Sequence, residues 1–351
     1  MAKGMGSWRP IKHRRTRNSL SSRHNNDVMC FGFPVATRHG WIWICLIVSL
    51  FAPASCLSSS TMSMTNPITL PVLQRLASSV RSKLPRSQRT PPLPSDHSSL
   101  YHPSNYVKKC AQFSPEGSSS GDQHLRGFCN WLVPGSLMVG QYPSLTPETD
   151  GPSQKEVQDH IRSIVADAGV RTFCCLQSEV PAQDNDDAWN SVDGAVHLEG
   201  SARSTWPGAF TWYAPLVRAA FEEAVAFNDD VDCTGATYLH APIQDFTVPD
   251  SSDNFFSLLY RLLEIMEANA GRSDGAIYVH CWAGRGRAGI VGSCILSLLY
   301  PEMNGRMILD LVQAGYDSRD GSECMPDALS QSPETSEQRD FVLGFASKTR
   351  G

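Results

Sequence analysis

The amino-acid sequence predicts an α/β fold in which helices flank a central, mainly parallel β-sheet. Along residues 106–348, short apolar runs alternate with longer runs that have helical periodicity. Glycines close two of the helical runs, at Gly169 and Gly271, as they commonly do at helix ends. This alternation is typical of a sheet covered by helices on both faces, and a hydrophobic content of 41% is sufficient for its core.

Four short apolar runs predict the strands of this sheet. They are residues 137–144, which end in a turn, and residues 170–176, 237–243 and 276–281. The last run is rich in β-branched residues and follows a Ser-Asp-Gly turn, so it predicts a fully buried strand.

Helical periodicity predicts six helices in the same region. Their ranges are 153–169, 211–228, 253–271, 288–300, 306–316 and 336–346. Residues 253–271 are amphipathic, whereas residues 288–300 are apolar throughout and predict a buried helix. Residues 178–205 are polar with clusters of Asp and Asn, and they predict a loop.

The chain joins a basic head to an acidic body, as expected when a targeting segment precedes an enzyme. Of its 30 Lys and Arg residues, 13 lie in residues 1–95, together with one of the 35 acidic residues, Asp27. No basic run follows residue 95, so nucleic-acid binding is not expected.

Residues 1–57 have the charged, apolar and small-residue order of a signal peptide. The apolar run, residues 41–51, is shorter than the roughly 20 residues that span a bilayer. Cleavage is therefore favoured over a single-pass signal anchor, the alternative in which an uncleaved 41–57 segment gives membrane association. Residues 58–105 are rich in Ser, Pro and Arg and predict a disordered linker or a transit peptide.

Residues 278–290 place a cysteine and an arginine in a loop between a strand and a helix. In open α/β sheets, ligands bind at the edge where strands end and the following helices begin, because the helix N-terminus offers free N–H groups. Gly284 and Gly286 let the backbone curl around one anion, and Arg287 adds a two-pronged contact to two oxygens. The same positive field favours the thiolate form of Cys281. The loop is therefore suited to attack by a thiolate on a bound tetrahedral anion.

The pattern His280-Cys281-x5-Arg287 resembles the signature of the cysteine-dependent protein tyrosine and dual-specificity phosphatases. The resemblance implies a protein tyrosine phosphatase-like fold and a phosphocysteine intermediate on Cys281, with Arg287 binding the phosphate and His280 supporting the loop. The remaining residues that the resemblance assigns to phosphate binding are Trp282, Ala283, Gly284, Arg285 and Gly286. The 11 cysteines lack the paired spacing of a disulfide framework or zinc site, and no metal or other cofactor is expected.

Protonation of the leaving oxygen requires a carboxylic acid. Residues 239–253 resemble the acid loop of the atypical dual-specificity group, which includes the cyclin-dependent kinase-associated phosphatase, and the match makes Asp245 the acid. Asp250 follows a Val-Pro pair and is the alternative; otherwise it, or Asp253, is a helix-capping residue. The closing helix of the family sometimes carries a glutamine that orients water, which makes Gln338 a candidate, although a solvated glutamine on the helix surface is the favoured interpretation.

Ala288 departs from the family, which usually has Ser or Thr immediately after the arginine. That hydroxyl helps the sulfur to leave when water cleaves the phosphocysteine. We therefore expect an active enzyme with a slow second step, a burst of product in rapid-mixing kinetics, and faster steady-state turnover in Ala288→Ser.

Phosphorylated proteins are the favoured substrates, acted on by a monomer. The loop also resembles that of glucan phosphatases, and Trp206, Trp212 and Tyr213 are either a sugar track or ordinary core and surface aromatics. A pseudophosphatase that binds phosphoproteins without turnover is a further alternative. A thiol enzyme needs a reducing compartment, so entry into the secretory pathway followed by transport to a plastid is expected. Such a two-part address resembles those of algae with secondary plastids.

Overall fold

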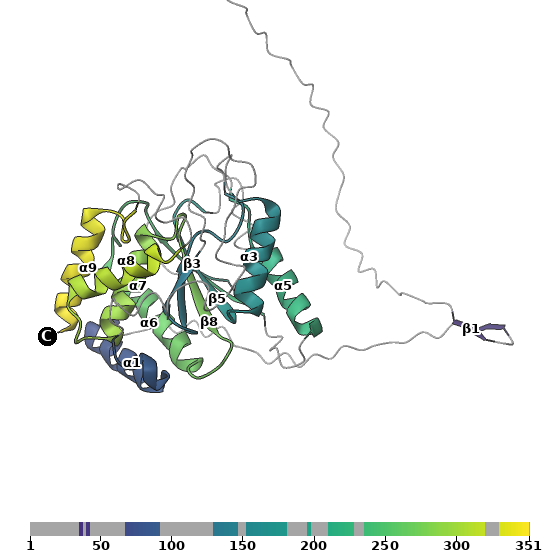
Figure 1. Ribbon diagram of the computed structural model, residues 1–351, viewed down its shortest axis with the longest axis horizontal. Coiled ribbons are helices and arrows are strands. Elements are labelled where there is room, and N and C mark those ends of the chain that lie inside the picture. The colour runs from purple at the N-terminus through teal and green to yellow at the C-terminus, as the bar shows by residue number, and fades with distance from the viewer. Residues whose placement is uncertain are drawn as a thin grey trace, which may run out of the picture. The chain divides into compact units, whose positions relative to one another are not determined.

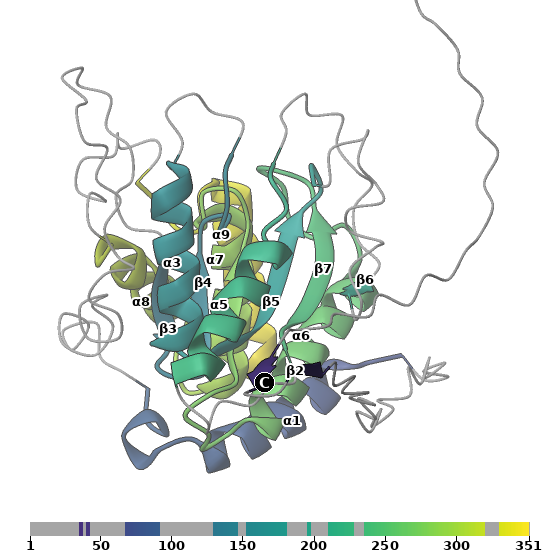
Figure 2. The ribbon, with the colours of Figure 1, turned by 90° about the vertical axis from the view of Figure 1, so that its right-hand side faces the viewer.

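The larger of two units in the computed structural model is a sheet with helices on both faces (Figures 1 and 2). The described residues are 35–37, 40–42, 67–91, 129–146, 152–180, 195–197, 210–227, 235–319 and 330–350. In the smaller unit, within residues 1–63, they form an antiparallel pair, β1 (Val35–Thr37) and β2 (Gly40–Ile42). Everything described below belongs to the larger unit, within residues 64–351.

Six strands of the described residues form one sheet in the order β3-β4-β8-β5-β7-β6. Their bounds are β3 Cys129–Val133, β4 Leu137–Gly140, β5 Val170–Gln177, β6 Ala195–His197, β7 Thr237–Ile243 and β8 Ala276–His280. Only the edge strand β3 runs antiparallel to its neighbour. All five residues of β8 are buried, as the apolar run predicts, and β8 lies between β4 and β5. The predicted mainly parallel sheet is thus confirmed.

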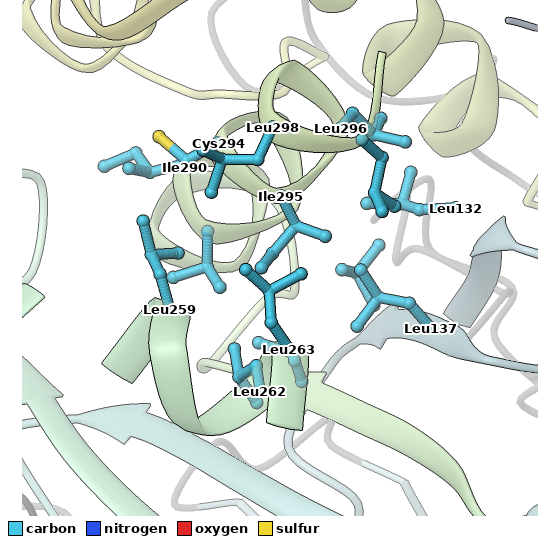
Figure 3. Packing of buried hydrophobic residues seen from close by; sticks show 14 of the residues in the cluster. Leu132, Leu137, Leu259, Leu262, Leu263, Ile290, Cys294, Ile295, Leu296 and Leu298 are labelled. Carbon is cyan, nitrogen blue, oxygen red and sulfur yellow. The ribbon is translucent and has the colours of Figure 1, made fainter. Parts of the chain in front are cut away.

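Helices α3 (Gln154–Ala166) and α5 (Ala214–Phe227) cover one face, and Figure 2 shows them in front of the sheet. The other face carries α6 Ser252–Ala268, α7 Gly286–Leu299, α8 Gly305–Asp317 and α9 Ser336–Thr349. All 14 residues of α7 are buried. Figure 3 shows its Ile290 and Ile295 packed near Leu259 and Leu263 of α6, in the larger of the two apolar clusters. The predicted buried helix is confirmed.

An additional helix, α1 (Leu70–Lys83), packs against α6 and α7. Its buried residues recur along one stripe of the helix and its end, at Leu73, Ala77, Val80 and Leu84. The prediction of a disordered stretch over 58–105 is therefore wrong for this helix. The Ser- and Arg-rich composition hid a stripe of only four small and medium apolar residues.

Polar contacts also attach α1 and the short 3-10 helix η1 (Arg86–Gln88) to the rest of the unit. Arg81 forms an ion pair with Glu302, and Lys83 Nζ lies 3.0 Å from Glu267 Oε1. The Tyr300 hydroxyl donates to the Gln88 carbonyl oxygen over 2.7 Å. The segment that follows the predicted signal peptide thus contributes to the folded unit.

The predicted loop over 178–205 contains a strand, β6, which pairs with β7. Three residues at a sheet edge give too short a pattern to be recognised in sequence. Most of the apolar run 41–51 lies outside the described residues, apart from the two residues that belong to β2. None of the helices in the described ranges is both long enough and apolar enough to cross a membrane.

Candidate active site

The loop between β8 and α7 closes against the end of strand β4. Cys281 follows β8 directly and is 3% exposed. Gly284 has φ +71°, and a Cβ atom there would overlap the backbone of Gly140. A hydrogen bond of 2.9 Å from the Tyr142 N–H to the Trp282 carbonyl also holds this loop against the end of β4. Glycine is therefore required at position 284, because the curled backbone needs both the positive φ and the missing side chain.

Arg287 is held in place by a carboxylate from another strand. Its Nη1 and Nη2 each donate to one oxygen of Glu179 over 2.7 Å, and Nη1 also donates to the Ile243 carbonyl over 3.2 Å. Both side chains of this ion pair are almost fully buried. Burial raises the pKa of Glu179, but the hydrogen bonds and charge of Arg287 outweigh it and hold that pKa below its usual range. The guanidinium is thereby fixed as a cation in one orientation.

Glu179 is one of the site residues that the sequence interpretation missed. It follows the carboxyl end of β5, and Arg287 follows β8, the neighbouring parallel strand. Carboxyl ends of parallel strands meet at one edge of a sheet, so a carboxylate directly after a buried strand is a usable signal.

Asp245 lies in the turn after β7 and reaches the same arginine. Its Oδ1 is 3.0 Å from Arg287 Nη2, and its side chain remains 38% exposed. Burial raises the pKa of Asp245, Arg287 opposes the shift, and the net change is upward. Asp250 is exposed at the start of α6, where Ser251 caps the helix rather than Asp250 or Asp253. The ion pairs of Arg287 within the described residues are with Glu179 and Asp245.

Gln338 connects the acid loop to helix α9. Its side-chain nitrogen donates to the Thr247 carbonyl over 3.0 Å, and its Oε1 accepts from the N–H groups of Glu334 and Thr335. The residue is fully buried. The favoured interpretation of a solvated surface glutamine is therefore wrong, and both ends of the amide position the acid loop against α9.

Residues 231–342, which contain Cys281, Arg287, Asp245 and Gln338 but not Glu179 or the end of β4, match the model of a protein family. Its description is PTP-SAK, Swiss Army Knife protein, DSP-PTPase phosphatase domain. Residues 231–342 thus match a cysteine-dependent phosphatase domain of the dual-specificity type.

Solved phosphatase structures show a weaker likeness to the chain. Kinase associated phosphatase, with its catalytic cysteine substituted by serine, is 14% identical, with 61% of this chain and 86% of that one covered at a TM-score of 0.37. Tk-PTP in its active form is 16% identical, with 63% and 97% covered at 0.34. TbPTP1 of Trypanosoma brucei is 13% identical, with 80% and 92% covered at 0.34. No curated protein sequence matches the chain significantly.

Arg319, which follows α8, contacts the loop from Cys281 to Arg287, called the phosphate loop below. It donates to the carbonyl oxygens of Gly284 and Ala283, over 2.9 and 3.4 Å, and to that of Val139, over 3.2 Å. Asn130 Oδ1 accepts from its Nε over 2.8 Å. In a planar trans peptide the N–H points opposite to the C=O. Carbonyls turned towards Arg319 therefore turn the N–H groups of the following residues away from it.

A second ion pair joins the phosphate loop to the segment before α9. Arg285 Nη2 donates to Glu334 Oε1 over 2.6 Å, and both side chains are about nine-tenths buried. The Arg285 carbonyl oxygen accepts from Ser332 Oγ over 3.0 Å. The predicted phosphate-binding residue Arg285 is therefore in contact with a carboxylate.

His280 is fully buried at the end of β8, where its ring contacts those of Tyr142 and Tyr213. Its Nε2 lies 3.0 Å from the Tyr213 hydroxyl, and burial lowers the pKa of His280 to about 3, so the ring is neutral at ordinary pH. Tyr213 is fully buried, which excludes it from a sugar track; Trp212 is half-buried beside it, and Trp206 lies outside the described residues. Ala288 is fully buried in the larger apolar cluster.

Proposed function

We propose that the domain hydrolyses phosphomonoesters on phosphotyrosine- or phosphoserine/threonine-containing proteins through a phosphocysteine on Cys281. The observation that supports this most is the position of Arg287, which Glu179 fixes with two hydrogen bonds while Asp245 lies 3.0 Å away. A phosphate bound by Arg287 and the loop N–H groups lies next to both a nucleophile and an acid. Electrostatic preorganisation of this kind often contributes more to an enzyme's rate enhancement than any other single effect.

In the first step the Cys281 thiolate attacks phosphorus, the S–P bond forms and the ester P–O bond breaks. Asp245 gives its proton to the departing oxygen, because an alkoxide or phenolate leaves poorly without one. In the second step water attacks phosphorus and gives a proton to Asp245, and the S–P bond breaks. Cleavage of the S–P bond regenerates the Cys281 thiolate, and phosphate is released. Ala288 offers no hydroxyl to the departing sulfur, which supports a slow second step.

The upward pKa of Asp245 gives a pH dependence with a definite sign. The acid must be protonated to act, so kcat/KM for a phosphopeptide falls as the pH rises through this raised pKa. Asp245→Asn should lose that falling limb and reduce kcat for phosphopeptides by about 10²–10⁴-fold. Asp250→Asn is the matched control, because Asp250 is exposed. If Asp250→Asn removes the limb and Asp245→Asn retains it, the assignment of the acid is wrong.

Cys281→Ser distinguishes this enzyme from a pseudophosphatase. Hydrolysis of an aryl phosphate such as p-nitrophenyl phosphate should disappear in the variant, while binding of a phosphopeptide should persist. An inert wild type that still binds phosphopeptides would support the pseudophosphatase instead.

A glucan phosphatase is the second candidate, favoured by the spelling of the loop from Cys281 to Arg287 and by Ala288. The burial of Tyr213 weakens it. A panel of phosphopeptides, phosphoinositides and phosphoglucan, compared by kcat/KM, separates the candidates. Higher kcat/KM on phosphoglucan than on every phosphopeptide would overturn the protein-phosphatase proposal.

A further inference from the structure

Two arginines of the phosphate loop differ in what surrounds them. Arg287 forms a fully buried ion pair with Glu179 and a second ion pair with the partly exposed Asp245. Arg285 is at the N-cap position of α7, and its guanidinium contacts Glu334, just before α9. Both arginines therefore contact carboxylates, but only the carboxylate of Glu334 contacts the guanidinium of Arg285 in an ion pair that links the loop to the segment before α9.

Glu334 is fixed in this position from several sides. Its backbone N–H donates to Gln338 Oε1 over 3.0 Å. A Cβ atom on Gly286 would lie 3.2 Å from Glu334 Oε2, so the carboxylate sits directly against the loop backbone. Ser332 adds a bond to the Arg285 carbonyl. Hydrogen bonds and packing against the loop backbone thus fix the position of the Glu334 side chain.

Glu334 also interacts electrostatically with Asp245 and Arg287. Burial raises the pKa of Glu334, Arg285 and Arg287 lower it, and the Asp245 carboxylate adds to the rise. Conversely, Arg285 lowers the pKa of Asp245. A second anion on a bound substrate would meet this carboxylate before it could use Arg285, and like charges at close range repel.

We propose that Glu334 is a specificity-determining residue that, by occupying Arg285, restricts the site to isolated phosphomonoesters and excludes substrates with a second phosphate next to the scissile one. This inference rests on the proposed function and narrows its substrate class. Inositol polyphosphates are the excluded chemistry, because their phosphates lie on adjacent ring carbons. Phosphorylated side chains of proteins carry a single phosphate and are accepted.

The test compares Glu334→Gln with wild type on two probes, a phosphotyrosine peptide and inositol hexakisphosphate. Glutamine keeps the shape of the side chain and removes its charge. The ratio of kcat/KM for the inositol probe to that for the peptide should rise at least tenfold. Glu337→Gln, an exposed carboxylate in the first turn of α9, should leave the ratio unchanged. An equal fall on both probes, or a wild type that hydrolyses both probes equally well, overturns the proposal.

A double variant and a binding arm complete the design. Arg285→Gln combined with Glu334→Gln should return the ratio of kcat/KM for the inositol probe to that for the peptide to within threefold of wild type. The double variant lacks the Arg285 guanidinium that would bind the second phosphate. If Glu334→Gln does not fold, Glu334→Asp, which withdraws the carboxylate, should raise the ratio about threefold. In a Cys281→Ser background, Glu334→Gln should bind inositol hexakisphosphate at least tenfold more tightly by calorimetry. This arm tests Glu334 even if hydrolysis fails, and unchanged affinity there contradicts the inference.

Discussion

Glu179 fixes the position of Arg287, the proposed phosphate-binding residue. A fully buried, bidentate carboxylate leaves Arg287 few other orientations. Breaking one partner of a buried pair leaves an uncompensated charge and costs about 3–5 kcal/mol.

Glu179→Gln should therefore lower kcat/KM for p-nitrophenyl phosphate by about 10²-fold, an effect of about 2.7 kcal/mol on the transition state. The glutamine NH2 cannot accept from the guanidinium, so Arg287 loses its fixed orientation. Steady-state kinetics and a thermal melt measure the two effects. Glu222→Gln, an exposed carboxylate on α5, is the control and should match wild type. Equal kcat/KM in Glu179→Gln and wild type would show that the loop alone orients Arg287.

We expect Ala288 to slow the second chemical step. Wild type should release a burst of product equal to the enzyme concentration, followed by slower turnover. Ala288→Ser should speed the steady state about 3- to 10-fold, which is about 0.7–1.4 kcal/mol. Rapid mixing with a saturating aryl phosphate measures both phases. A linear trace in wild type would mean that the first step limits the rate.

Residues within the loop could be predicted from sequence, whereas their partners could not. Cys281 and Arg287 are six positions apart, so their relation is set by a local motif. Glu179 lies 108 positions before Arg287, and its role depends on β5 and β8 being neighbours. The resemblance makes Gln338 a candidate, but its burial depends on how α9 packs against the acid loop.

At the scale of elements, the phosphate loop is held between β4, α7 and the end of α8. Arg319 joins these parts through its bonds to Gly284 and Val139. It lies beyond the predicted helix over 306–316, and no local pattern marks it.

Arg319→Met should weaken tungstate binding about tenfold in a Cys281→Ser background, because the loop N–H groups lose their preset direction. Arg319→Lys should give a smaller loss of affinity, because lysine keeps the positive charge but lacks the planar guanidinium that donates to several carbonyls at once. Arg306→Met, exposed at the start of the same helix, should have no effect. Calorimetry below the melting temperature measures the affinities. A lower melting temperature with unchanged tungstate affinity would leave Arg319 a purely structural role.

Long, strongly patterned elements agree with their predictions to within a few residues, as α6 and α7 show. The missed elements have weak local signals. Helix α1 carries a narrow apolar stripe in a composition typical of linkers, and β6 has three residues. Their stability comes from tertiary packing, which no local window contains.

At the scale of the whole molecule, α1 places the start of the folded unit earlier than residue 106. Its three buried Leu and Val residues within or next to the helix are Leu73, Val80 and Leu84. At about 1.5–3 kcal/mol each they contribute roughly 5–9 kcal/mol, an upper estimate. This is comparable with the total stability of a typical domain, about 5–15 kcal/mol.

A chain that begins at residue 67 should therefore melt like the full-length protein, whereas one that begins at residue 92 should be insoluble or melt at least 10 °C lower. Circular dichroism and size-exclusion chromatography measure these outcomes. Equal melting of the two truncations would show that α1 is dispensable. Fusing residues 1–66 to a fluorescent reporter tests the predicted secretory and plastid address, and a purely cytosolic signal would reject it.

Helix α1 also sets the order in which the chain can complete its fold. Ser79 of α1 contacts Glu267 of α6, 188 positions later. At about 5–20 residues per second, a ribosome makes that partner roughly 10–40 s after α1. For that time the first helix of the domain has no surface on which to bury its apolar stripe. Helix α1 therefore cannot complete its packing until α6 has been made, and until then its apolar stripe is open to binding by a chaperone.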